Sequence, residues 1–193
     1  MSLQPKPYFS PEDYLALERS AEFKSEYFDG EIFAMAGPSE SHNLIVANTL
    51  SEIRQQLKKR PCKTYANDMR VKVSPTGLFA YPDVVVVCGQ AQFDDSHRDT
   101  LLNPTLIVEV LSESTEAYDR GRKFEYYRKL ESLAEYVLIA QHRPHVESYR
   151  RQPDQRWVLT ESNELDGNLR LDAMDCELAL AEIYDKVEFP DAS

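Results

Sequence analysis

Three things are scarce in this sequence: cysteine, positive charge, and apolar segments long enough to cross a membrane. The cysteines Cys62, Cys88 and Cys176 are odd in number, far apart and outside any Cys-x-x-Cys spacing, which argues against a disulfide framework and against a zinc site. We therefore expect reduced thiols. No apolar stretch approaches the roughly 20 residues of a membrane helix, and the N-terminus lacks the apolar segment of a signal peptide. These absences predict a cytoplasmic protein that does not insert into a membrane.

The shortage of positive charge bears on possible partners. The chain has 22 Lys and Arg against 33 Asp and Glu, a formal net charge of -11, whereas nucleic-acid binding depends on cations that meet phosphates. A metal-dependent nuclease is still compatible with this balance, because a metal ion supplies local charge and a basic groove can coexist with an acidic remainder. Three clusters could form such a groove, although each is more often a solvated helix face: Lys58-Lys59-Arg60, Arg120 to Lys123, and Arg128-Lys129.

Length and composition predict a globular protein. The chain has 193 residues, of which 42% are hydrophobic and 28% charged, unlike the composition of a disordered chain. We predict a single domain over residues 1–193, with its core at about 41–141.

Apolar spacing and turn signals predict an α/β (α+β) fold with a mixed sheet flanked by helices. Ser10-Pro11 starts a short helix, Asp29-Gly30 marks an N-terminal hairpin, and apolar steps of four, three and four predict a helix over about 41–59. The other expected elements are a strand containing 71–73, strands that begin near 82 and 103, a helix over 116–130, a strand over 136–139, C-terminal antiparallel strands near 146–149 and 157–159, and a short helix around 178–184.

One charged residue interrupts a strand that is otherwise apolar. Glu109 lies within Leu106 to Leu111, and a second acid, Asp83, directly precedes four valines. A buried, isolated carboxylate costs several kcal/mol unless something pairs with it, protonates it or coordinates it. Neighbouring strands lie about 4.8 Å apart and magnesium takes oxygen ligands at roughly 2.1 Å, so two such acids can share a cation. Phosphodiester hydrolysis is a natural chemistry for that site, with a nearby lysine to stabilise the phosphate charge.

Simpler explanations exist for both acids. Asp83 follows a proline and could be the solvent-facing start of a strand. Glu109 could be neutralised without any metal by a buried partner such as Arg70 or Lys123.

The order of these residues resembles a known superfamily. Pro82-Asp83 followed by Glu109-Val110-Leu111 is similar to the PD-(D/E)-x-K nuclease pattern, and the helix, three strands, helix, strand order is similar to its common core. Five segments between about Ser10 and Tyr184 together resemble the Uma-type family of restriction-endonuclease-like proteins: Glu26-Tyr27-Phe28-Asp29-Gly30-Glu31, Ser41-His42, Pro82-Asp83-Val84-Val85-Val86, Val108-Glu109-Val110-Leu111-Ser112, and Asp119-Arg120-Gly121-Arg122-Lys123-Phe124-Glu125-Tyr126-Tyr127.

This resemblance implies a magnesium-dependent endonuclease, with manganese as a possible substitute, that acts on DNA as a homodimer. Asp83, Glu109 and the Val110 carbonyl would bind the metal. Leu111 stands where the superfamily has its lysine, and the family resemblance shifts that catalytic role to Lys123 on the following helix. The expected supporting residues are His42, Asp119, Tyr127 and Glu26.

Other readings of the same residues stay open. Lys123 could form an ordinary surface pair with Asp119, four positions earlier, His42 could be a surface residue at a helix start, and Glu26 an ordinary acid near a turn. At the level of function, the alternatives are a catalytically silent interaction or nucleic-acid-binding module with a nuclease fold, and an enzyme that acts on RNA or a nucleotide.

Overall fold

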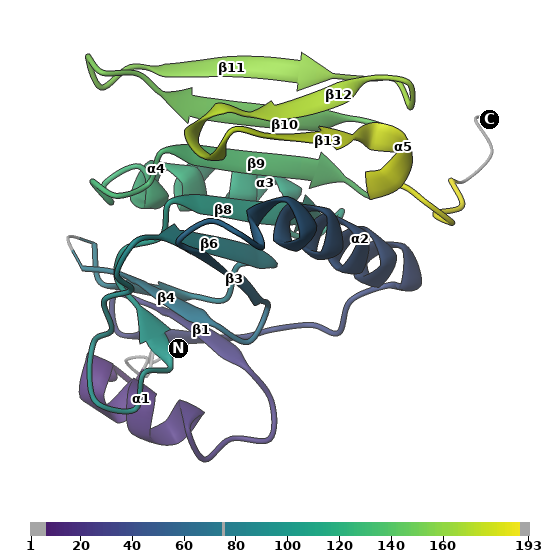
Figure 1. The fold of residues 1–193 in the computed structure, drawn as a ribbon. Coiled ribbons are helices and arrows are strands. Elements are labelled where there is room, and N and C mark those ends of the chain that lie inside the picture. Colours follow the sequence, from purple (N-terminus) through teal and green to yellow (C-terminus); the bar gives the residue numbers. More distant parts are fainter. Residues whose placement is uncertain (1–6, 75, 190–193) are drawn as a thin grey trace.

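The computed structural model describes residues 7–74 and 76–189, and three sheets lie within them (Figure 1). The six-stranded sheet contains, in spatial order, β11 (Trp157–Ser162), β10 (Val146–Arg151), β9 (Glu135–Ala140), β8 (Leu106–Leu111), β6 (Val84–Cys88) and β3 (Cys62–Ala66). The five-stranded sheet contains β2 (Glu31–Ala34), β1 (Ser25–Phe28), β5 (Leu78–Ala80), β4 (Arg70–Val73) and β7 (Thr100–Leu101), and the third sheet is a hairpin of β12 (Asn168–Leu171) and β13 (Cys176–Ala179).

The helices are short apart from one. They are α1 (Pro11–Glu18), α2 (Glu40–Leu57), α3 (Glu116–Tyr118), the π-helix η1 (Asp119–Lys123), α4 (Phe124–Tyr127), the 3₁₀ turn η2 (Asp172–Met174) and α5 (Leu180–Ile183). None of the helices within residues 7–74 and 76–189 combines the length and the apolar character needed to cross a membrane.

The six-stranded sheet is mixed, as the sequence predicts. β3, β6 and β8 pair antiparallel, whereas β8 and β9 run parallel. A parallel pair needs a long crossover connection, and here that connection carries α3, η1 and α4. The crossover therefore brings the segment with Asp119 and Lys123 back over the sheet.

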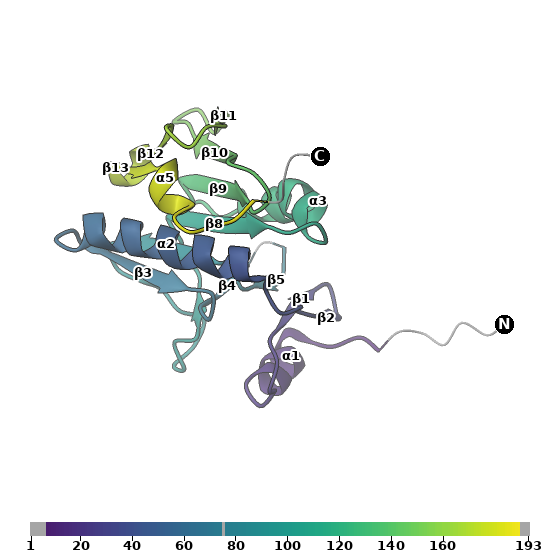
Figure 2. The same ribbon diagram turned by 90° about the vertical axis from the view of Figure 1, so that its right-hand side faces the viewer.

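The two faces of this sheet pack against different layers. Along β6, Val84 and Val86 belong to the hydrophobic cluster that includes α2 and α5, while Val85 and Val87 belong to the cluster that includes β4, β5 and α4. We call these the α2 face and the opposite face; Figures 1 and 2 show α2 along the first. Side chains alternate between faces along a strand, so Glu109, between Val108 and Val110 of the α2 face, points to the opposite face. Glu109 thus lies beneath the crossover segment.

Local turn and cap signals are realised at the N-terminus. Ser10 caps α1 and forms a reciprocal capping box with Asp13, which satisfies two amide donors at the helix start. Asp29 and Gly30 join β1 to β2 with φ values of 47° and 84°, the left-handed conformation of a type I′ hairpin turn. A Cβ atom at Gly30 would also lie 2.1 Å from the Tyr8 ring, so only glycine fits there.

The prediction of one regular α-helix over 116–130 is wrong. The segment forms three short helical pieces, α3, η1 and α4, and the middle one is a π-helical turn at Asp119–Lys123. Gly121 lies within this turn and lowers the helical propensity there. π-turns recur at functional sites, and this one buries both Asp119 and Lys123 against the sheet.

The expectation of three reduced thiols is also wrong. Cys62 on β3 and Cys88 on β6 are direct cross-strand partners with a Cα–Cα distance of 4.0 Å, and a disulfide joins them. Cys176 is buried and free. The separation of 26 residues could not indicate the pairing, because the register of two strands brings the cysteines together. The disulfide fixes the edge strand β3 to its neighbour β6.

The strand count differs from the prediction as well. Residues 62–66 and 70–73 form two strands in different sheets, where one strand is expected. β5, β7, β12 and β13 are additional. These strands are two to four residues long, too short to show a clear alternation of apolar and polar residues.

Candidate active site

The charged residues singled out from the sequence converge on Lys123. Its Nζ lies 3.0 Å from Glu109 Oε1, 3.0 Å from Glu26 Oε1 and 3.4 Å from Asp119 Oδ1. Three separate elements supply these acids: β8, β1 and the π-turn η1. Lys123 is only 6% exposed, so this is a buried ion cluster and not a surface pair.

The backbone explains why Lys123 reaches Glu109. Glu109 points to the opposite face of the sheet, and the crossover between β8 and β9 places η1 over that face. Within η1, Asp119 and Lys123 are four residues apart and both turn inward. The Tyr118 ring lies 5.9 Å from Lys123 Nζ and adds a cation–π contact. Lys123 therefore approaches Glu109 from the layer above the strand.

Glu109 is held by a second donor. The Tyr127 hydroxyl donates a hydrogen bond of 3.0 Å to Oε1, the oxygen that also faces Lys123. Oε2 accepts no hydrogen bond from any residue in the described part of the chain. Burial raises the pKa of Glu109 well above its ordinary value; Lys123 opposes this, and the carboxylates of Asp119, Asp83 and Glu26 add to it.

Lys123 stays protonated in this cluster. Burial by itself lowers the pKa of an ammonium group, but Glu109 and the other acidic groups around it raise the pKa of Lys123 well above its usual range. The cation is therefore fixed in charge and in position.

Asp83 forms the second half of the site. His42 Nε2 lies 2.9 Å from Asp83 Oδ1, and the Val110 amide donates a hydrogen bond of 2.7 Å to Oδ2. His42 is in the first turn of α2, where its own amide donates to the capping Ser39 hydroxyl. Asp83 and Glu109 are therefore linked through the backbone of β8, since Val110 follows Glu109. The amide of Val110 is a contact that the sequence does not suggest; its carbonyl remains the predicted metal ligand.

The charge balance of the cluster fits a divalent cation. Three carboxylates, those of Glu26, Glu109 and Asp119, surround one ammonium group, and the Asp83 carboxylate adds a fourth negative charge that acts on Glu109. Asp119 Oδ1 is buried and forms an ion pair of 3.4 Å with Lys123 but no hydrogen bond with any described residue, and burial raises the pKa of Asp119 against the effect of Lys123. Carboxylate and backbone oxygens are the ligands that magnesium and manganese prefer. The donor set thus suits such an ion and supplies the negative charge that it would offset.

Comparison with known proteins places the chain in a family. Residues 11–181 match the sequence profile of Uma2, which is described as "Putative restriction endonuclease". The chain belongs to the Uma2 family. Two curated relatives come from Synechocystis sp. (strain ATCC 27184 / PCC 6803 / Kazusa): "Uncharacterized protein sll1609", 37% identical over 77% of this chain and 84% of its own length, and "Uncharacterized protein slr1290", 34% identical over 96% of both chains.

A solved structure shares the fold of this Uma2 chain. It is described as "a putative nuclease belonging to DUF820 from Anabaena variabilis ATCC 29413" and matches with a TM-score of 0.77, covering 93% of this chain and 99% of its own. At 18% identity, the likeness concerns the fold. The predicted family and the predicted mixed α+β fold are both confirmed.

Of the two predicted partners for Glu109, Arg70 and Lys123, Arg70 is wrong. Buried Arg70 instead contacts the Thr100 and Tyr81 hydroxyls and lies 3.1 Å from Asp99. Lys123, the other candidate partner, is the one that contacts Glu109. The Tyr81 amide, which donates to Glu26 Oε1 at 3.4 Å, is a further site contact that nothing in the sequence indicates.

A second group of possible metal ligands lies elsewhere in this Uma2 protein. Within residues 7–74 and 76–189, the ligand atoms of His145, Glu147 and Glu161 lie within 4.8 Å of one another. Glu147, however, already contacts Arg120 and accepts a hydrogen bond of 2.9 Å from the Tyr149 hydroxyl. An arginine thus supplies positive charge at this second group, as Lys123 does beside Glu109.

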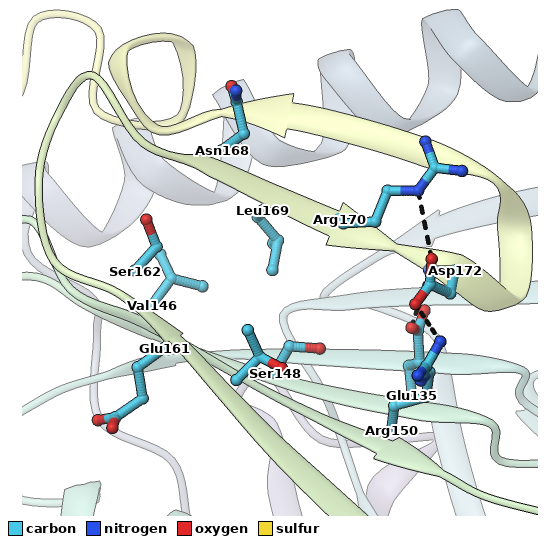
Figure 3. Close-up of a pocket in the computed structure, with 11 residues that line it drawn as sticks. Glu135, Val146, Ser148, Arg150, Glu161, Ser162, Asn168, Leu169, Arg170 and Asp172 are labelled. Carbon is cyan, nitrogen blue, oxygen red and sulfur yellow. Dashed lines mark hydrogen bonds and ion pairs between the residues drawn. The ribbon is translucent and has the colours of Figure 1, made fainter.

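A cavity of about 210 Å³ lies between β10, β11 and β12, and buried Glu135 is part of its wall. Figure 3 shows Arg150 and Arg170 joined to Asp172 beside Glu135. Glu135 Oε1 accepts a hydrogen bond from the Asp172 amide, while Oε2 is buried without a partner among the described residues. Burial raises the pKa of Glu135 from 4.5 to about 7. Glu135 is therefore a neutral acid in the fold at mildly acidic pH.

This shift predicts a pH-dependent stability that Glu135→Gln should remove. The folded pKa lies above the unfolded one, so the contribution of Glu135 to stability is complete below about pH 4.5 and is lost as pH rises through about 7. At about 1.4 kcal/mol per pKa unit, the loss is about 3 kcal/mol. Urea unfolding should show that the free energy of unfolding of the Gln variant rises relative to that of the wild type between pH 5 and pH 8. An equal difference at both pH values would contradict the assignment.

Proposed function

We propose that this Uma2 protein is a divalent-metal-dependent endonuclease that hydrolyses phosphodiester bonds in DNA. The observation that carries the proposal is the 3.0 Å contact between Lys123 Nζ and Glu109 Oε1. It brings an acid and a lysine together although the strand that carries Glu109 has Leu111 in place of the lysine. The family description supports the same activity.

Each residue has a proposed task. Asp83, Glu109 and the Val110 carbonyl would hold magnesium or manganese, which when bound lowers the pKa of a water molecule and neutralises charge on the phosphate. His42 and the Val110 amide orient the Asp83 carboxylate, and Tyr127 orients Glu109. Lys123 donates hydrogen bonds from a fixed position to the attacking water or to a phosphate oxygen. Glu26 and Asp119 keep Lys123 protonated and in place.

The proposal also includes an oligomeric state and a cellular location. Cutting both strands of a duplex needs two sites, which favours a homodimer that places one site against each strand. DNA as substrate favours a cytoplasmic protein.

One observation favours a second candidate, a catalytically silent module with the nuclease fold. Lys123 forms ion pairs with three carboxylates, so the cluster could serve as a purely structural ion-pair network. Buried networks of this kind can fix a conformation without taking part in chemistry.

Plasmid cleavage separates these two candidates. Purified protein with magnesium or manganese should convert supercoiled plasmid into nicked and linear forms, and EDTA should stop the reaction because the acids alone cannot activate water. Parallel reactions with single-stranded DNA and with RNA define the substrate. Cleavage that persists in EDTA, or no cleavage with either metal, would contradict the proposed function.

A further inference from the structure

A basic groove stands out on this acidic protein. It has a volume of about 640 Å³ and lies between the C-terminal half of α2 and the edge strand β3. Arg54, Lys58 and Lys63 are among its lining residues, and no Asp or Glu is. The chain has 33 acidic and 22 basic residues, so a groove whose charged lining residues are all basic is suited to a negatively charged partner.

The three cations are free to bind such a partner. All three are exposed, and none forms an ion pair with any residue in the described part of the chain. Other basic residues are already engaged: Arg60 with Asp175, and Arg120 with both Glu116 and Glu147. Of the basic clusters seen in the sequence, Lys58-Lys59-Arg60 therefore contributes Lys58 to the groove.

The rest of the lining suits a sugar–phosphate backbone. Ser51, Arg54, Gln55 and the C-cap residue Lys58 form one stripe along α2, at the spacing that places residues on one helix face. On the other side β3 is the last strand in the sheet order, so its outer edge pairs with no strand in the described part of the chain. Hydroxyl, amide and backbone N–H groups beside Lys and Arg are the usual phosphate contacts of DNA-binding proteins.

The groove leads towards the candidate active site. β3 runs from Lys63 in the groove to Ala66, which pairs with Val84, the residue after Asp83. Three residues of strand span about 10 Å, or about three nucleotides at 3.4 Å each. His42, in the first turn of α2, contacts Asp83. The two elements that line the groove, α2 and β3, therefore each extend beyond it to a residue near Asp83.

We propose that the groove between α2 and β3 binds the phosphate backbone of duplex DNA a few nucleotides from the bond to be cut. This inference rests on the proposed nuclease function and adds to it a second contact region. Arg54, Lys58 and Lys63 hold flanking phosphates, so the duplex lies along β3 when it reaches Asp83.

Anisotropy of a short fluorescein-labelled DNA duplex tests this without any cleavage, because the titration is done in EDTA. The variant Arg54→Gln/Lys58→Gln/Lys63→Gln should bind at least about tenfold more weakly at low salt. The slope of log affinity against log salt should fall by up to about 2.7, since each lost phosphate contact contributes about 0.9.

The matched control is Lys59→Gln/Arg156→Gln/Lys186→Gln, which removes the same charge from exposed residues outside the groove. Its affinity and salt slope should stay near the wild-type values. Equal losses in both triple variants, an unchanged groove variant, or a wild type that binds tripolyphosphate but no duplex would overturn the inference. Groove-dependent binding by a protein that cleaves no DNA with any metal would instead count against the nuclease proposal alone.

Discussion

Asp83→Asn should lower plasmid cleavage by about 10³-fold while the protein stays folded. A metal at a phosphoryl oxygen stabilises the transition state by several kcal/mol, and about 4 kcal/mol corresponds to 10³ in rate. Asparagine keeps the size of Asp83 and an oxygen for the Val110 amide, which donates to it at 2.7 Å, but it loses the charge that holds the cation. Initial rates of supercoiled-plasmid loss at saturating magnesium measure the effect.

The matched control for this variant is Asp94→Asn. The Asp94 side chain is 20% exposed and pairs with Lys72 at 2.7 Å, whereas the Asp83 side chain is 13% exposed. Asp94 lies outside the cluster around Lys123, so its variant should cleave at the wild-type rate. If Asp83→Asn retained full activity, or if both variants lost it equally, Asp83 would not be a metal ligand.

The acids of the site could be predicted because they break a pattern. Glu109 is a charge within an apolar strand, and Asp83 opens another, so burial alone requires a partner for each. The hairpin at Asp29-Gly30 and the helix α2 could also be predicted, because each depends on residues that are close together in the sequence. Local rules are sufficient for such elements.

Contacts between distant strands could not be predicted in this way. The disulfide between Cys62 and Cys88 depends on the register of β3 against β6, and the Val110 amide meets Asp83 through the register of β6 against β8. Glu26 reaches Lys123 because the five-stranded sheet packs over the opposite face. The catalytic role of Lys123 is indicated only by the family resemblance, and the π-turn that buries this residue leaves no periodic signal.

Lys123→Met should both abolish cleavage and lower the free energy of unfolding by about 3–5 kcal/mol. Methionine fills a similar space, but it leaves Glu109, Glu26 and Asp119 without the cation that lies 3.0 to 3.4 Å from them. Removing one partner of a buried ion pair costs this much because the remaining charge is uncompensated. Urea unfolding at neutral pH in EDTA measures the loss. Lys72→Met, which breaks the partly exposed pair with Asp94, should cost about 1 kcal/mol or less.

A second substitution separates the structural task of Lys123 from its catalytic one. In Lys123→Met/Glu109→Gln the nearest uncompensated charge is gone, and the glutamine can still accept the hydrogen bond from Tyr127, so stability should recover by at least about 1–2 kcal/mol relative to Lys123→Met. Activity should not recover, because both the metal ligand and the donor to phosphate are missing. A double variant that regained cleavage together with stability would show that Lys123 serves the fold alone. A double variant no more stable than the single one would show that Glu109 is not the charge that Lys123 neutralises.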